Sequence, residues 1–310
     1  MKFIVFFLII IAAGQAFGQD AVVNNSNQEK TQLAAPKPSD DLTQDTVKTS
    51  QSSNKTQSQL NLADNAAFAS TSPFSAMIDS TFSTDTKEFG DDKVSGNQTL
   101  IFLNYRLNSE YTGRLFFSVD KQLSNGYETI IGDTRVRIAK RGIKLSDKAT
   151  LLPSASLVLP TSEKSKRNEE KIAGLELNLG VNYQLSNSLS VFYLPRVIKN
   201  FHEYETSRTN SVNVDYSIMQ ILSLGYRYND KWSFTPTVLY FNSWAYGGTQ
   251  RDPSYISILE LGYLHSRSLQ LAVGTMTGGA LVNLENAPDK SFELYDKNTS
   301  SLYGKFTLMF

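Results

Sequence analysis

Several segments of the chain alternate apolar residues with polar ones, and some of these polar positions carry a charge. Arg135 and Arg137 flank Val136, and Glu176 stands between Leu175 and Leu177. In an extended chain alternate residues share one face, so these charges gather opposite the apolar side chains. A face of this kind either attracts and passes small anions or is filled by arginines paired with carboxylates, and the sequence leaves both interpretations open. The candidates for this charged face are Asp79, Arg106, Arg114, Asp120, Arg135, Arg137, Arg141, Glu176, Arg196, Asp215, Glu260 and Lys305.

Groups suited to nucleophilic or metal chemistry are scarce. The chain has no cysteine and two histidines. His265 is followed by Ser266, but a nucleophile and its base also need a fixed geometry and an oxyanion hole, which no motif supplies. His202 lies among the charged residues Glu203, Glu205 and Arg208 of a polar segment. The sequence therefore predicts no catalytic residue, no metal ligand and no cofactor, with a hydrolase kept only as a remote alternative.

Overall charge and hydropathy exclude further classes of protein. Lys and Arg together number 30, as do Asp and Glu, so the formal net charge is zero. Nucleic-acid binders carry a basic excess, and we therefore expect no nucleic-acid partner. After the N-terminal segment the sequence contains no apolar run of about 18 residues, the length that a membrane-spanning helix requires.

The charged positions belong to long alternating segments. Leucine, valine and tyrosine occupy every second position from Leu175 to Leu185, with Glu, Asn, Gly and Gln between them. Strands of soluble proteins are shorter, whereas about 9–11 residues are needed to cross a bilayer as a tilted strand. The pattern returns about twelve times between residues 73 and 310, which predicts a set of membrane-spanning strands.

The connections between these segments alternate in length. Long polar stretches such as 161–171 and 278–297 follow the odd segments, and tight turns such as Ser186-Asn187 and Asn229-Asp230 mostly follow the even ones. Membrane barrels have short periplasmic turns and longer outside loops. The alternation therefore predicts an antiparallel up-and-down barrel in which both ends of the barrel domain face the periplasm.

The chain divides into three parts. Residues 1–18 have a positive start, an apolar core and the small-residue motif Ala16-Phe17-Gly18, which predicts a cleaved signal peptide. Residues 19–70 are polar and nearly free of aromatic residues, so they cannot bury enough apolar surface to offset the entropy of ordering. We interpret them as a disordered periplasmic linker that precedes a barrel domain over residues 71–310.

The last segment carries a family resemblance. Leu302, Phe306, Leu308 and the terminal Phe310 fall on one face at a spacing of two. In this feature the chain resembles the bacterial outer-membrane β-barrel proteins, whose last strand alternates in this way and ends in Phe. The resemblance implies that these four residues form the signal recognised by the barrel assembly machinery, and that outer-membrane lipid surrounds the barrel.

The sequence thus predicts an all-β transmembrane barrel of about twelve strands in the outer membrane of a Gram-negative bacterium. The expected function is a porin-like channel for passive passage of a small solute. The alternative is a non-conducting structural or surface-recognition barrel that acts through its long outside loops. The identity of the solute, the openness of the lumen and the oligomeric state are not encoded in the pattern.

Overall fold

The structure is almost entirely antiparallel β-sheet. A computed structural model describes residues 72–87, 94–124, 127–280 and 299–310. The expected signal peptide (1–18) and the whole of the expected linker (19–70) lie outside these residues. The strands are β1 (Phe74–Asp85), β2 (Ser95–Arg106), β3 (Tyr111–Gln122), β4 (Thr129–Ile131), β5 (Thr134–Lys140), β6 (Ile143–Lys144), β7 (Ala149–Leu159), β8 (Lys171–Gln184), β9 (Leu189–His202), β10 (Val214–Arg227), β11 (Trp232–Ala245), β12 (Ser254–Ser266), β13 (Leu269–Ala280) and β14 (Ser300–Met309).

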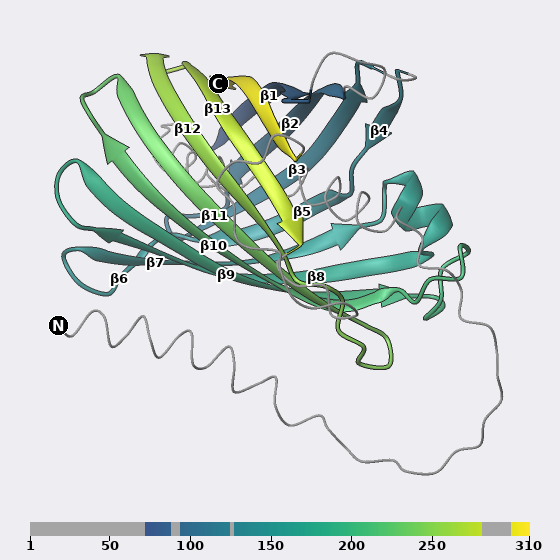
Figure 1. Cartoon of the computed structure of the whole chain (residues 1–310). Helices are drawn as coiled ribbons and strands as arrows, with labels where there is room; N and C mark the ends of the chain where they lie inside the picture. Colours follow the sequence, from purple (N-terminus) through teal and green to yellow (C-terminus); the bar gives the residue numbers. More distant parts are fainter. Residues whose placement is uncertain (1–71, 88–93, 125–126, 281–298) are drawn as a thin grey trace, which may run out of the picture. The chain divides into compact units, whose positions relative to one another are not determined.

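These strands close into one barrel. Strands β4 and β5 both pair with β3, and β5 and β6 both pair with β7, while every other strand pairs with its neighbours in the chain. Strand β1 pairs with β14 from Met77↔Met309 to Asp85↔Ser301, which removes the open edge (Figure 1). The 14 strands make twelve barrel strands because β4, β5 and β6 lie end to end and count as one. Closure satisfies the backbone hydrogen bonds within the protein, which the hydrocarbon layer requires. The prediction of an antiparallel barrel of about twelve strands is confirmed.

The fourth barrel strand differs from the single segment that its alternating sequence predicts. It breaks at Gly132-Asp133, between β4 and β5, and again between β5 and β6. Gly132 lies against Ser118 of β3, and Asp133 turns its carboxylate toward Ser162 and Ser165 in the next connection. That connection contains a short π-helix, η1 (Lys164–Asn168). Alternation alone gives no signal for this break, because it depends on a partner about 30 residues away in the chain.

The outer face of the barrel is apolar. Leu177 of β8 points outward and is 52 % exposed, whereas its neighbour Glu176 points inward and is 0 % exposed. The same division holds for outward Leu175 and Leu179 and inward Asn178. The lipid-facing and interior faces therefore follow the predicted alternation. Within the described residues, no helix is long and apolar enough to cross a membrane.

Aromatic residues mark both ends of the lipid-facing surface. The two tryptophans of the chain, Trp232 and Trp244, lie near opposite ends of β11. Trp232 lies beside Tyr263 with ring centroids 4.8 Å apart, and Trp244 stacks on Tyr216 at 4.6 Å. Twelve residues of extended chain at the usual tilt cover about 30 Å along the barrel axis, which matches the thickness of the hydrocarbon layer. Interfacial aromatic pairs of this kind fix the depth of a barrel in the bilayer.

Part of the barrel interior is apolar. This differs from the sequence prediction, in which the inner face of each strand carries the polar residues. Inward side chains of β9–β13, together with Tyr303 of β14, pack into one buried group that we call the aliphatic cluster. Its members are Phe192, Leu194, Met219, Ile221, Leu239, Ile256, Ile258, Met276 and Tyr303. In β10 both faces are apolar, since Ile218 and Leu222 point outward while Met219 and Ile221 point inward. The interior therefore combines a packed apolar arc with the charged positions described below.

Gly274 of β13 provides the space into which Tyr303 fits. A Cβ added at Gly274 would lie 2.5 Å from the Tyr303 ring and would also collide with the carbonyl oxygen of Leu259. We expect Gly274→Ala to lower the free energy of unfolding by about 1–3 kcal/mol, as overpacking of interiors does. Urea titration in lipid vesicles measures the change. Gly304→Ala is the matched control, because a Cβ at Gly304 would have no atom within 4 Å. Equal losses of unfolding free energy in both variants would show that Gly274 is not needed to make room for Tyr303.

The final strand places the expected assembly residues on the lipid side. Leu302, Phe306 and Leu308 share the outward face of β14, opposite inward Tyr303 and Lys305. The backbone of Phe310 exchanges two hydrogen bonds with Ala76 of β1, at 2.9 and 3.1 Å. This strand is therefore the one whose pairing with β1 closes the barrel, and its role as an assembly signal stays a prediction.

Candidate functional site: the charged barrel interior

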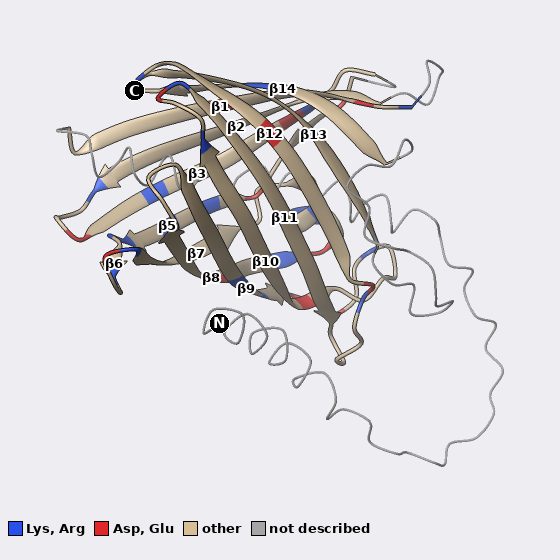
Figure 2. Ribbon diagram, turned by 60° about the vertical axis from the view of Figure 1, so that its left-hand side comes forward, with Lys and Arg blue, Asp and Glu red and all other residues tan. Residues whose placement is uncertain are grey.

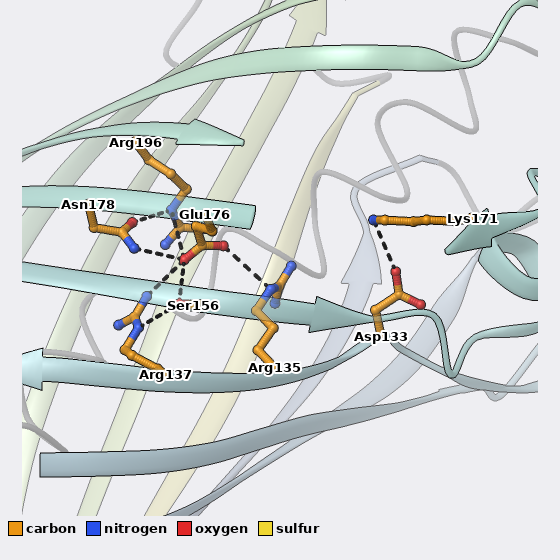
Figure 3. A network of polar contacts seen from close by, with 8 residues as sticks. All are labelled: Asp133, Arg135, Arg137, Ser156, Lys171, Glu176, Asn178 and Arg196. Carbon is orange, nitrogen blue, oxygen red and sulfur yellow. Dashed lines mark hydrogen bonds and ion pairs between the residues drawn. The ribbon is translucent and has the colours of Figure 1, made fainter. Parts of the chain in front are cut away.

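Glu176 is surrounded by three arginines from two other strands (Figure 3). Arg137 Nη2 donates to Glu176 Oε1 at 3.0 Å, and Arg196 Nε lies 3.6 Å from the same oxygen. Arg135 Nε lies 3.5 Å from Oε2. We call Glu176, Arg135, Arg137 and Arg196 the arginine cluster. Its formal charge is +2, because three guanidinium groups face one carboxylate.

Strand register and two neutral side chains assemble this cluster. Arg137 of β5 pairs in register with Ser156 of β7, which pairs with Glu176 of β8. Ser156 Oγ and Asn178 Nδ2 donate to Glu176 Oε1 at 3.3 and 2.9 Å, and Asn178 Oδ1 accepts from Arg196 Nε at 2.8 Å. Hydrogen bonds of this kind offset the cost of removing the charges from water.

Arg135 is the most accessible guanidinium of the arginine cluster. Its side chain is 20 % exposed, compared with 7 % for Arg137 and 1 % for Arg196. Its Nε and Glu176 Oε2 are buried and form no hydrogen bond with the residues that the structure describes. Arg135 also lies over the Phe116 ring at 5.3 Å, which holds the guanidinium in place. The guanidinium group is thus held in place, with part of the side chain exposed to the interior.

A second group of charges lies on β1, β12 and β14. Glu260 Oε2 accepts from Lys305 Nζ at 2.5 Å and from the Tyr303 hydroxyl at 3.0 Å. Asp79 is fully buried and accepts from Thr307 at 2.7 Å and from Thr81 at 3.3 Å. We call Asp79, Glu260 and Lys305 the acidic cluster, and its formal charge is −1. Figure 2 shows how few charged positions interrupt the strands between their ends.

The other predicted lining residues lie beside these clusters or at the ends of the barrel. Arg114 is buried on β3 and pairs in register with Arg137. Asp120 lies farther along β3, and its carboxylate accepts a hydrogen bond of 2.6 Å from the Gln98 side chain. Arg106 is the last residue of β2 and donates to the Ser72 carbonyl at 2.7 Å, so it lies at the end of the inner face. Arg141 is exposed just beyond β5, and Asp215 pairs with Lys199 at a bulge near the start of β10.

The loop end of the barrel holds a separate ion pair. Asp133 Oδ2 lies 3.5 Å from Lys171 Nζ (Figure 3). The Asp133 carboxylate also accepts hydrogen bonds from the backbone N–H of Ser162 and the hydroxyl of Ser165. Although burial raises the pKa of Asp133, the charge of Lys171 and the two serines together hold that pKa below its ordinary value. Asp133 is therefore charged at neutral pH and ties the break in the fourth barrel strand to the η1 connection.

Both histidines lie at or near the ends of strands. Ser266 Oγ accepts backbone hydrogen bonds from Ser268 and Leu269, as a turn residue does, and His265 is exposed. His202 Nδ1 lies 3.3 Å from the Tyr246 hydroxyl at the loop end of β9. The described part of the chain contains no group of three or more His, Cys, Asp or Glu side chains placed to hold a metal ion.

Sequence reasoning identified the charges of both clusters but missed their neutral partners. Asn178, Ser156 and Tyr303 contribute hydrogen bonds that hold the acids in place. Asn178 lies two residues from Glu176 on the same face, so its position carried a usable signal. Tyr303 is fixed by the absence of a side chain at Gly274, which only the register of β13 with β14 reveals.

Comparison with solved structures finds outer-membrane barrels. The chain is similar to the COG4313 outer membrane channel from Pseudomonas putida F1, with a TM-score of 0.55 and 14 % identity, covering 76 % of this chain and 95 % of that one. It is also similar to the NanC porin, with a TM-score of 0.50 and 9 % identity over 75 % of this chain and 98 % of that one. At these identities the likeness establishes the barrel fold. No protein-family model matches the sequence, and no curated protein matches it.

Proposed function

We propose that this protein is an outer-membrane channel for passive passage of small solutes. The observation that carries the proposal is the charge of the arginine cluster, in which one buried carboxylate faces three guanidinium groups. An interior that served only as packing would need no excess of charge, because unbalanced buried charge is costly. The similarity to two outer-membrane channel barrels supports the same interpretation. We place the barrel in the outer membrane, inserted by the barrel assembly machinery.

The passage is narrow. Several inward side chains at mid-barrel have less than 2 % of their surface exposed, among them Arg196, Ile221 and Leu239. Interior side chains can nearly fill a small barrel, and larger barrels leave a wider lumen. We therefore expect small solutes to pass and large oligomers to be excluded. The excess of guanidinium groups would favour anions among the small ions.

Ion preference provides the test. We expect Arg135→Gln to lower the permeability ratio of chloride to potassium by about threefold, because it removes the most accessible positive charge. Reversal potentials across planar bilayers under a KCl gradient measure the ratio. Arg135→Lys should retain most of the preference, since it keeps the charge.

Arg141→Gln is the control for any general effect of removing an arginine, because Arg141 is exposed beyond β5. We expect it to leave the ratio unchanged. If the wild type, Arg135→Gln and Arg141→Gln all have the same permeability ratio of chloride to potassium, the arginine cluster does not set the ion preference. A folded wild-type barrel without conductance would favour instead the non-conducting, surface-recognition alternative.

A further inference from the structure

The two charged clusters lie on opposite sides of the barrel. In a ring of twelve barrel strands, opposite strands are six steps apart. Six steps separate β9 from β1, β8 from β14, and β5 from β12. Arg196 is therefore opposite Asp79, Glu176 is opposite Lys305, and Arg137 is opposite Glu260.

The clusters also lie at a similar depth. Arg137 is the middle residue of β5, and Glu260 is the middle residue of β12. Asp79 and Arg196 likewise lie near the middle of β1 and β9. A formal charge of +2 thus faces a formal charge of −1 across the middle of the interior. Low-dielectric walls strengthen a field of this kind, and a solute that carries both charges would align with it.

Each cluster has one charged side chain that is more exposed to the interior than its other members. The Arg135 side chain is 20 % exposed, the largest fraction in the arginine cluster, so part of its guanidinium group is open to the interior. Tyr303 and Lys305 both donate to Oε2 of Glu260, and within the described residues no hydrogen bond reaches its other oxygen, Oε1, which can accept from a cationic group. The Glu260 side chain is 13 % exposed, whereas the Glu176 side chain is 0 % exposed. Arg135 and Glu260 are therefore the two charged groups best placed to meet a solute.

The aliphatic cluster connects the two charged regions along one side of the interior. It occupies β9 to β13 and so fills the arc between Arg196 of β9 and Glu260 of β12. Tyr303 belongs to this cluster and also donates to Glu260, so the apolar surface reaches the carboxylate directly. A solute with an apolar middle would lose less hydration energy beside this arc than one that is polar throughout.

We propose that the preferred solute is a small zwitterion with an aliphatic middle, whose anionic end contacts Arg135 and whose cationic end contacts Glu260. This inference rests on the proposed channel function, since a closed barrel admits no solute. It differs from simple anion preference, because a plain anion gains nothing from Glu260.

Single-channel current interruption tests the proposal with three matched probes at neutral pH, which are 6-aminohexanoate, hexanoate and hexylammonium. In the wild-type chain we expect 6-aminohexanoate to interrupt the current for about threefold longer than either singly charged probe. Glu260→Gln should remove this advantage without shortening the hexanoate events. Arg135→Gln should shorten the events of both carboxylate probes.

Two further variants separate recognition from misfolding. Glu260→Asp keeps the charge and should retain most of the advantage of 6-aminohexanoate. Glu163→Gln removes a carboxylate at the barrel end and should change none of the three dwell times, because that side chain is 73 % exposed. If 6-aminohexanoate dwells no longer than hexanoate in a conducting wild-type channel, the zwitterion proposal is overturned and the channel function stands. If the folded wild type does not conduct at all, both are overturned.

Discussion

Replacement of Glu176 by glutamine is expected to lower the free energy of unfolding of the barrel by about 3 kcal/mol or more. The carboxylate is the shared partner of three guanidinium groups, and two of these are less than a tenth exposed. Glutamine retains the shape of the side chain and some of its hydrogen bonds. It leaves three guanidinium groups close together without the negative charge that neutralises part of their repulsion. Urea titration in lipid vesicles, followed by tryptophan fluorescence, measures the loss.

The matched control for this prediction is Glu163→Gln. Glu163 pairs with Arg167 at 2.8 Å, but both side chains are 73 % exposed, and exposed pairs contribute little to stability. We expect the unfolding midpoint of this control to match the wild type. A Glu176→Gln barrel as stable as the control would show that the arginine cluster does not need its carboxylate.

The second large effect is expected on the lipid side of the same strand. Leu177→Lys places an ammonium group on the outward face of β8, next to Glu176, where the leucine is half exposed to the bilayer. A charge near the bilayer midplane costs a barrel about 2–4 kcal/mol. The measurement is again urea unfolding in vesicles, together with the fraction that keeps the faster electrophoretic mobility of a folded barrel without heating.

Leu145→Lys makes the same chemical change outside the membrane-spanning strands. Leu145 is exposed in the turn between β6 and β7, where an ammonium group can reach water. We expect little change in stability. If both lysine variants were equally stable, the assignment of the β8 outward face to lipid would be wrong.

The fold was predictable because the bilayer imposes a simple pattern. A strand such as β8 must present leucines to lipid and can place polar residues inside, so the alternation from Leu175 to Leu185 identifies both faces. Strand β10 shows the limit of this reasoning. Its inward Met219 and Ile221 are as apolar as its outward Ile218 and Leu222, so alternation could not indicate that this part of the interior is packed with apolar side chains.

The site was predictable in composition but not in arrangement. Alternation placed Glu176, Arg137 and Arg196 on the inner face, yet it could not pair them. Their contact depends on the register of β5, β7, β8 and β9, which backbone hydrogen bonds set across segments distant in the chain. For the same reason the opposition of Arg137 and Glu260 appears only when the number of barrel strands is known.

Single-channel recording of the refolded chain in a planar bilayer determines whether the barrel conducts ions. A channel lined by the arginine cluster should give discrete openings of uniform size, with a reversal potential under a KCl gradient that indicates preference for chloride. If the barrel shows the heat-modifiable mobility of a folded protein but gives no openings at any applied voltage, the proposed channel function is contradicted.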